Sequence, residues 1–223
     1  MNFFKRLFNR KPLTLASLAF EAPGWQVQET NARKQVWAHP GHAAVLSLHF
    51  FDVPPDLPVR PEDHVALRAY YRNVIQAQHG GLVEVAAGVL PHTRISVIKT
   101  IFKVPRQPRG TGYIGSLTLP FRQCSYVVKI QAEEAGMTGM REAVIADQLF
   151  REGKTSFGEN DLPGWAADPY DPAWKQGALM NLAEREEYDP LFPGHPLTIV
   201  REGLKAAAAH LKPGKELLRA ERF

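Results

Sequence analysis

The sequence predicts an α/β protein of the α+β type, with a mainly antiparallel sheet of six or seven strands and helices packed on it. Residues 113–121 and 124–130 each alternate apolar and polar side chains, the pattern of strands with one buried face. A turn near residues 120–123 lets these two runs pair as a hairpin. Residues 95–104 have apolar side chains at both odd and even positions, which indicates a strand covered on both faces.

Three further strands are expected before the first helix. They cover about residues 24–27, 34–37 and 43–51, and short turn-like stretches separate them. Residues 54–61 are rich in proline, which cannot donate a ladder hydrogen bond, so this stretch interrupts the sheet.

The first helix is expected over residues 61–79. Pro61 suits the first helical position, and two glycines after His79 stop the helix. Alternation over residues 83–89 predicts the next strand, and an apolar stripe over residues 139–152 predicts a second helix after the hairpin.

The amino-acid composition of the chain changes after residue 153. Glycine, proline and aromatic residues between 155 and 172 predict an ordered loop. Asp171 and Pro172 are then expected to begin a helix that runs to about Glu187, and Pro196 is expected to begin another.

Three segments follow from this pattern. Residues 1–12 form a basic amphipathic N-terminal segment, residues 13–153 an α/β sandwich domain, and residues 154–223 a helical C-terminal extension packed on that domain.

The composition is that of an ordinary globular protein. Of 223 residues, 44% are hydrophobic and 22% are charged. The formal charge of +4 is too small to indicate a nucleic-acid partner, which is not expected. A single cysteine excludes an intramolecular disulfide, and reducing cytoplasm is the simplest compartment.

The N-terminal segment admits two interpretations. Phe3, Phe4 and Phe8 are grouped against lysine and arginine at helical spacing, as in short helices that lie on anionic membranes. The simpler interpretation is a frayed terminus whose aromatic residues pack on their own domain. Weak peripheral membrane contact through this segment therefore stays an alternative.

The motifs for catalysis, cofactors and metals each fail on spacing or burial. Residues 110–115 match the glycine pattern of dinucleotide sites, but a strand follows where a helix is required. Cys124 lies on the apolar face of its predicted strand, where a buried thiol is inert. His39 and His42 lack the further ligands that zinc needs. We therefore predict no catalytic residue, no cofactor and no metal.

Acidic residues in the extension offer a second possibility. Asp168 and Asp171 could form the carboxylate pair of a hydrolase-like enzyme. Asp-Pro sequences flanked by aromatic residues are more often turns and helix caps, and the same holds for residues 189–196.

Candidate binding residues fall into two groups, aromatic side chains of the extension and basic side chains near the hairpin ends. Such basic residues beside an aromatic suit an acidic protein partner or a nucleic acid, although charged residues at hairpin tips are more commonly there for solubility and edge protection. The predicted binding residues are Trp165, Tyr170, Trp174, Lys103, Arg106 and Arg109.

The order of elements over about residues 24–152, together with Gly24, Trp25 and the hairpin of residues 113–133, resembles the α/β/α sandwich of the PsbP-like superfamily. That group includes PsbP, the Ran-binding Mog proteins and bacterial DcrB-like proteins. The resemblance implies a non-enzymatic role in protein interaction and assigns no residue to it. Residues 154–223 lie outside it and look like the extension of uncharacterised bacterial proteins.

The leading expectation is a cytoplasmic, non-enzymatic protein-binding module, such as an adaptor, a chaperone or an immunity-type protein. The alternatives are the hydrolase-like enzyme at Asp168 and Asp171 and the peripheral membrane protein. A pocket with converging titratable groups would favour an enzyme, whereas an open apolar surface would favour a binding module.

Overall fold

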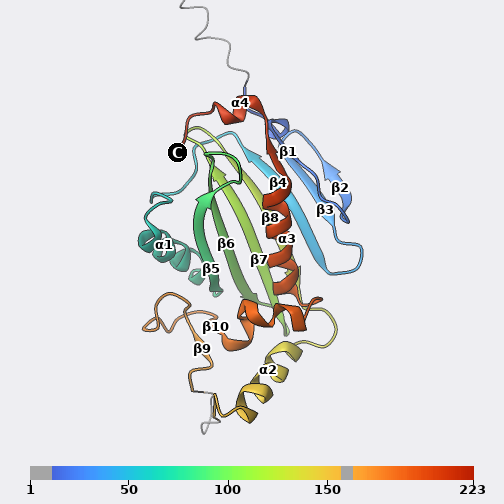
Figure 1. The fold of residues 1–223 in the computed structure, drawn as a ribbon, viewed down its shortest axis with the longest axis vertical. Coiled ribbons are helices and arrows are strands. Elements are labelled where there is room, and N and C mark those ends of the chain that lie inside the picture. The colour runs from blue at the N-terminus through green and yellow to red at the C-terminus, as the bar shows by residue number, and fades with distance from the viewer. Residues whose placement is uncertain (1–11, 157–162) are drawn as a thin grey trace, which may run out of the picture.

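The computed structural model describes residues 12–156 and 163–223, and its main element is a seven-stranded antiparallel sheet (Figure 1). The strands lie in the order β2-β3-β4-β8-β7-β6-β5. Their bounds are β2 Gln26–Thr30, β3 Lys34–Ala38, β4 Ala44–Phe51, β5 Gly81–Val89, β6 Ser96–Pro105, β7 Thr111–Pro120 and β8 Ser125–Glu133. The predicted fold class and all seven predicted strands are confirmed, with boundaries moved by a few residues.

Four α-helices and several short elements complete the described chain. The helices are α1 His64–Gln76, α2 Met140–Arg151, α3 Pro196–His210 and α4 Lys215–Leu218. The short strands are β1 Leu18–Phe20, β9 Ala166–Ala167, β10 Met180–Asn181 and β11 Leu211–Pro213. The 3-10 turns are η2 Leu15–Ser17, η3 Leu182–Glu184 and η4 Glu186–Leu191.

Helix α3 covers the middle of one face of the sheet, over β7 and β8. Its buried Leu197, Val200 and Leu204 pack into the same apolar core as Leu117 of β7 and Ile130 of β8. The core therefore joins residues on both sides of position 154. Short strand β1, near the start of the described chain, pairs with β11 directly after α3.

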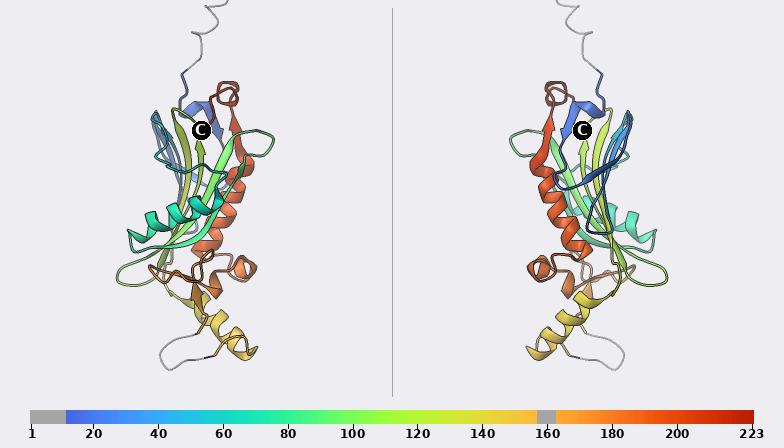
Figure 2. Two further views of the ribbon diagram at one scale, coloured as in Figure 1. Left: turned by 90° about the vertical axis from the view of Figure 1, so that its left-hand side faces the viewer. Right: turned by 90° about the vertical axis from the view of Figure 1, so that its right-hand side faces the viewer.

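Helix α1 lies on the opposite face, as the side views show (Figure 2). Leu67 and Ile75 of the helix are buried with Val85 of β5 and Ile98 of β6. Alternate side chains of β6 thus enter different cores, because Ile101 belongs to the core under α3. This arrangement confirms that the 95–104 strand is covered on both faces.

Two predicted helix boundaries are corrected. The first helix begins at His64, because the Asp63 side chain accepts a hydrogen bond from the Ala66 N–H at 3.0 Å and acts as its N-cap. The helix expected from Asp171 to Glu187 is absent: this stretch contains turns, β10 and the 3-10 elements η3 and η4.

Among residues 12–156 and 163–223, no helix combines the length and the apolar character needed to cross a bilayer. The predicted membrane contact through Phe3, Phe4 and Phe8 falls in residues 1–11, outside the described part of the chain.

Candidate functional site

The predicted binding residue Tyr170 closes part of a sheet edge. Its hydroxyl group lies 2.8 Å from the backbone N–H of Val85, from which it accepts a hydrogen bond, and 3.1 Å from the Val85 carbonyl. The Arg68 guanidinium lies 4.2 Å from the centre of its ring. Because β5 is an edge strand, these bonds occupy ladder groups that would otherwise be open.

Asp168 and Asp171 are engaged by their own surroundings. Asp168 is buried and forms two hydrogen bonds of 2.9 Å with Arg72, and it also accepts the backbone N–H of Tyr170 and of Asp171. Asp171 accepts the N–H of Ala173, as in an Asx-turn. The geometry of these carboxylates is that of a loop anchor, and it does not favour the hydrolase-like alternative.

The two tryptophans of the extension also contact their own loop and domain. The Arg72 guanidinium lies 5.2 Å from the centre of the Trp174 ring, and the indole N–H donates to the Gln176 carbonyl. Trp165 packs against the small core of Ile145 and Leu149 under α2.

The three predicted basic residues lie in different surroundings. The Lys103 ammonium donates to Glu184 at 3.0 Å and to the Leu179 carbonyl at 2.9 Å, away from the surface. Arg106 forms an exposed ion pair with Glu133, and Arg109 is exposed in the loop between β6 and β7. The six predicted binding residues therefore do not form one site.

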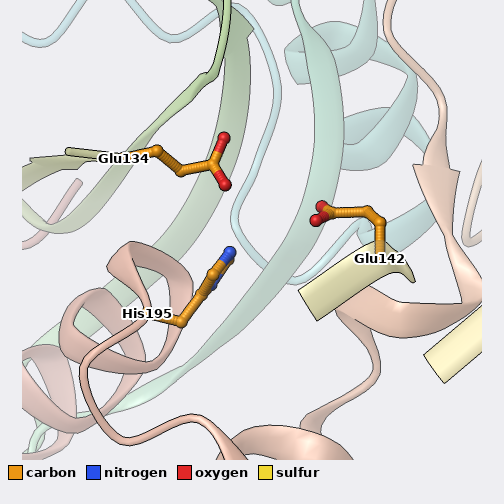
Figure 3. Close-up of side chains that lie close together, drawn as sticks. All are labelled: Glu134, Glu142 and His195. Atoms are coloured by element: carbon orange, nitrogen blue, oxygen red, sulfur yellow. The ribbon is translucent and has the colours of Figure 1, made fainter. Parts of the chain in front are cut away.

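A polar cluster that the sequence did not predict lies at one end of the sheet, between β8, α2 and α3. Glu134, Glu142 and His195 each offer a ligand atom, and these atoms all lie within 4.8 Å of one another. Figure 3 shows the three side chains pointing toward a common centre. Glu134 and His195 line a cavity of about 390 Å³.

Glu134 is held in place by backbone donors. One carboxylate oxygen accepts the Thr111 N–H and the other accepts the Gly139 N–H, both at 2.8 Å. Glu134 comes directly after β8, Thr111 begins β7, and Gly139 is the N-cap of α2, with φ of 75°. The carboxylate thus ties the sheet end to the start of the helix.

Glu142 lies in the first turn of α2, where the helix dipole favours a negative charge. Its Oε2 atom is buried and has no hydrogen-bond partner among the residues that the structure describes. Burial is the largest cause that raises the pKa of this carboxyl group, and the negative charges of Glu134 and Glu184 raise it further. The bond to its own backbone N–H and the charge of Lys103 act in the opposite direction.

His195 is the N-cap of α3, and its Nδ1 atom accepts the Leu197 N–H at 3.2 Å. In the neutral ring the proton therefore resides on Nε2, which is buried without a partner. Burial, together with the charges of Arg141 and Arg201, lowers the pKa of His195 to about 3. The imidazole is neutral at pH 7.

A network of buried ion pairs lies next to this cluster and holds the helices that carry it. Asp189 accepts hydrogen bonds from Arg141 of α2 at 2.8 Å and from Arg201 of α3 at 3.0 Å. Arg141 also donates to the carbonyls of Ala183 and Arg185. The network connects both helices through the segment between them, which fixes the elements that carry Glu142 and His195.

The other motifs of the sequence lie elsewhere. Cys124 is only 2% exposed, and burial raises the pKa of its thiol to about 11, so the expected inert environment is confirmed. The rings of His39 and His42 lie 4.7 Å apart, and the Trp25 ring lies 4.9 Å from that of His39. The glycine pattern at 110–115 leads into β7, a strand.

Part of the face that carries α1 has no helix over it within residues 12–156 and 163–223. Helix α1 packs on β5, and among these residues no helix lies over the side chains of β3, β4, β8 and β7 that point to this face. We call this surface the open half-face. It comprises Val36, Val45, Ser47, His49, Phe51, Ile114, Val127 and Lys129, which share one face by strand register.

The open half-face combines exposed apolar groups with a groove. Val45 is 41% exposed and Phe51 is 45% exposed. Val45 and Ile114 line a groove of about 470 Å³ that extends to Val104 and to Arg106. Large apolar side chains in the middle of a sheet are usually covered, so this surface is a candidate docking face.

Comparison with known proteins gives structural matches only. No family model matches the chain, and no curated protein matches it. A solved structure of a mutant of the protein Mog1 is similar over 91% of this chain and 94% of that chain, with a TM-score of 0.43 and 10% sequence identity. A crystal structure from Bacteroides thetaiotaomicron VPI-5482 is similar over 61% of this chain, with a TM-score of 0.33 and 11% identity.

The second match spans 45% of the Bacteroides chain, so this protein corresponds to less than half of its length. At 10 and 11% identity no residue role is transferred from either structure. The function of the chain therefore rests on the geometry of the open half-face and of the polar cluster.

Proposed function

We propose that the chain is a non-enzymatic protein-binding module, of the adaptor, chaperone or immunity type, and that its partner binds the open half-face. The observation that supports this proposal is the part of the sheet that no described helix covers, where Val45 and Ile114 line a groove and Phe51 is exposed at the other end of β4. Burying such side chains against a partner removes apolar surface from water, at about 25 cal/mol per Å².

The charge of the open half-face specifies the chemistry of the partner. Burial is the main cause that lowers the pKa of His49, and the positive charges of Lys129 and Lys34 lower it further. Lys34 forms an ion pair with Glu29, whereas Lys129 forms none with any residue that the structure describes. A complementary partner segment is amphipathic, with apolar side chains over Val45 and carboxylates near Lys129.

Two substitutions test the docking face, and a third serves as a control. Val45→Glu places a charge on the apolar groove, and Lys129→Glu reverses the unpaired charge. Val65→Glu changes a valine of α1 that is 77% exposed and lies outside the open half-face. All three sites are on the surface, and circular dichroism with thermal unfolding checks that each variant folds like the native chain.

Tagged native protein and the three variants are used to capture partners from lysate of the source cells at moderate salt, with quantification by mass spectrometry. We expect one protein with an acidic amphipathic segment to be retained by the native chain and by Val65→Glu. Its yield should fall at least tenfold with Val45→Glu and with Lys129→Glu. Equal capture by all four proteins, capture of a second copy of this chain alone, or recovery of salt-labile nucleic acid alone contradicts the proposal.

Two expectations from the sequence remain proposals beside this one. Cytoplasmic location is tested by cell fractionation, where recovery in an oxidising compartment would oppose it. Membrane contact through residues 3–11 is tested by sedimentation with anionic liposomes before and after deletion of residues 1–11. Unchanged sedimentation would exclude that contact as the anchor.

A further inference from the structure

Two buried polar atoms at the end of the sheet have no partner, and both belong to the polar cluster. They are Oε2 of Glu142 and Nε2 of His195. Burying a polar atom without a hydrogen bond is costly, so such atoms are rarely kept without a reason. Both side chains point toward the same centre as the fixed carboxylate of Glu134 (Figure 3), and one ligand atom of each residue lies within 4.8 Å of the others.

We propose that Glu134, Glu142 and His195 form a binding site for one divalent transition-metal cation. The three ligand atoms lie within 4.8 Å of one another. A cation with bonds of about 2.0–2.2 Å keeps its ligand atoms about 3–4.4 Å apart, so the side chains have to move together by less than about 2 Å. The adjoining cavity of about 390 Å³ gives solvent and cation access to Glu134 and His195.

The two carboxylates of the cluster favour a cation at its centre. Glu134 and Glu142 bring two carboxylates together, and each raises the energy of the other in ionised form. The basic side chains that act on the cluster are held in ion pairs, Lys103 with Glu184 and both Arg141 and Arg201 with Asp189. The charges of the two arginines, which lower the pKa of His195, oppose the cation, so the two carboxylates have to outweigh them. A bound divalent cation offsets the repulsion between the two carboxylates and gives Glu142 Oε2 a partner.

The ligand set indicates the class of metal. Imidazole nitrogen suits zinc, iron, nickel and copper, whereas carboxylates alone suit magnesium, calcium and manganese. One imidazole with two carboxylates therefore favours Zn²⁺ or Mn²⁺ over Mg²⁺. The Thr111 and Gly139 N–H groups donate hydrogen bonds to Glu134 and fix the orientation of its carboxylate. Carboxylates that bind metals are commonly held by such hydrogen bonds.

Metal binding competes with the helix cap at His195. For Nε2 to bind a metal, its proton has to move to Nδ1, which then no longer accepts the Leu197 N–H. The cap and the metal therefore use alternative tautomers of the same ring. This competition lowers the affinity for the metal. It also means that the cap and the metal ligand can be tested separately by substitution of His195.

The test uses the full chain, dialysed against a chelator and titrated with ZnCl₂, MnCl₂ or MgCl₂ alone in a calorimeter. We expect one Zn²⁺ or Mn²⁺ per chain, a higher Tm with that metal, and at least tenfold weaker binding of Mg²⁺. Glu142→Gln should weaken transition-metal binding at least tenfold while the metal-free chain stays folded.

Two further variants are informative. One removes the metal ligand at position 195 but keeps a helix cap, and the other changes a carboxylate next to the proposed site. Asn at position 195 can still accept the Leu197 N–H, so His195→Asn should keep the metal-free Tm within a few degrees and lose at least tenfold in affinity. Glu133→Gln changes a neighbouring carboxylate that pairs with Arg106 and should bind like the native chain.

Three results would overturn the proposal. The first is native protein that binds neither Zn²⁺ nor Mn²⁺. The second is binding that survives Glu142→Gln and His195→Asn unchanged. The third is binding that is lost instead in a His39→Ala, His42→Ala double variant, which would place the metal on that adjacent pair of rings.

Discussion

At the scale of single residues, the buried carboxylate of Asp189 joins two helices through its hydrogen bonds. It accepts hydrogen bonds from two arginines, Arg141 and Arg201, that are themselves buried. Removing one partner of a buried ion pair leaves an uncompensated charge in a medium of low polarity. Here removal of a single carboxylate would leave two such charges.

We predict that Asp189→Ala lowers the free energy of unfolding by about 3–5 kcal/mol. Asp147→Ala is the matched control, because Asp147 forms an exposed pair with Arg151 one helical turn away and should cost less than about 0.5 kcal/mol. Urea denaturation of the three proteins measures both changes. Equal midpoints for the two variants would contradict the role assigned to Asp189.

Cys124 provides a second prediction at this scale. With a thiol pKa of about 11 and an exposed fraction of 2%, Cys124 is neutral and shielded at pH 8. We expect the native chain to react with iodoacetamide at least a hundredfold more slowly than the chain in denaturant, as measured by mass spectrometry. Similar rates in both states would show that the thiol is accessible.

The sign of the pH dependence follows from the same shift. The unfolded thiol ionises near pH 9, whereas the folded thiol ionises only near pH 11. The contribution of Cys124 to stability is therefore complete below pH 9 and is lost as the pH rises toward 11. A Cys124→Ala variant should lose less stability than the native chain over that interval.

The sequence could not predict that the residues of the polar cluster lie close together. Glu134, Glu142 and His195 come from a strand end, a first helical turn and an N-cap, and no local spacing relates them. The only local signal is His195 before Pro196, which indicates a turn and a helix cap. His195 is indeed the N-cap of α3, but this signal does not relate it to Glu134 or Glu142. Their meeting depends on how α2 and α3 pack at the end of the sheet, which no periodicity encodes.

At the scale of elements, the strands were predictable because alternation is a local property of a half-buried strand. The helix expected after Asp171 is absent, and the reason is only partly local. The Asp171 side chain accepts the Ala173 N–H and supports a turn, and the Ala178 N–H donates to the Gly80 carbonyl near β5. Tertiary bonds to the sheet edge thus replaced the helical hydrogen bonds.

The contact between α3 and β7 gives a prediction for this scale. A Cβ atom at Gly115 would lie 2.4 Å from Cγ1 of Val200 and 2.7 Å from Cδ1 of Leu204, so the glycine permits the close approach of the helix. We predict that Gly115→Ala lowers the unfolding free energy by about 1–3 kcal/mol, through overpacking.

Gly88→Ala is the control in a strand, because a Cβ atom there meets nothing within 4 Å. It should be neutral or stabilise by up to about 1 kcal/mol, because alanine restricts the unfolded chain. Thermal unfolding compares the two variants. A Tm for Gly115→Ala at or above that of Gly88→Ala would contradict the close packing of α3.

At the scale of the whole molecule, the two faces of the sheet are covered unequally. Helix α3 lies over the centre of one face, whereas α1 lies near the β5 edge of the other (Figure 1). Strand order decides this asymmetry, because β5 follows α1 in the chain and occupies an edge. The sequence predicted helices on the sheet but could not show which strands each would cover.

The same asymmetry explains why the predicted binding residues and the open half-face are different sets of residues. Aromatic residues such as Tyr170 and Trp174 were selected for their chemistry, and in the fold they contact the β5 edge and Arg72. The open half-face is instead made of ordinary strand residues, such as Val45, whose exposure depends on the missing layer. Whether either set binds a partner is a question for experiment.

The most direct test of the docking proposal is photocrosslinking in cells with p-benzoylphenylalanine at position 45, compared with the same residue at position 65. Position 45 lies on the open half-face and position 65 on α1. We predict that position 45 crosslinks to one protein, within an acidic amphipathic segment, and that position 65 does not. Crosslinks to that protein from position 65 but not from position 45 would contradict the proposal that the open half-face is the docking surface.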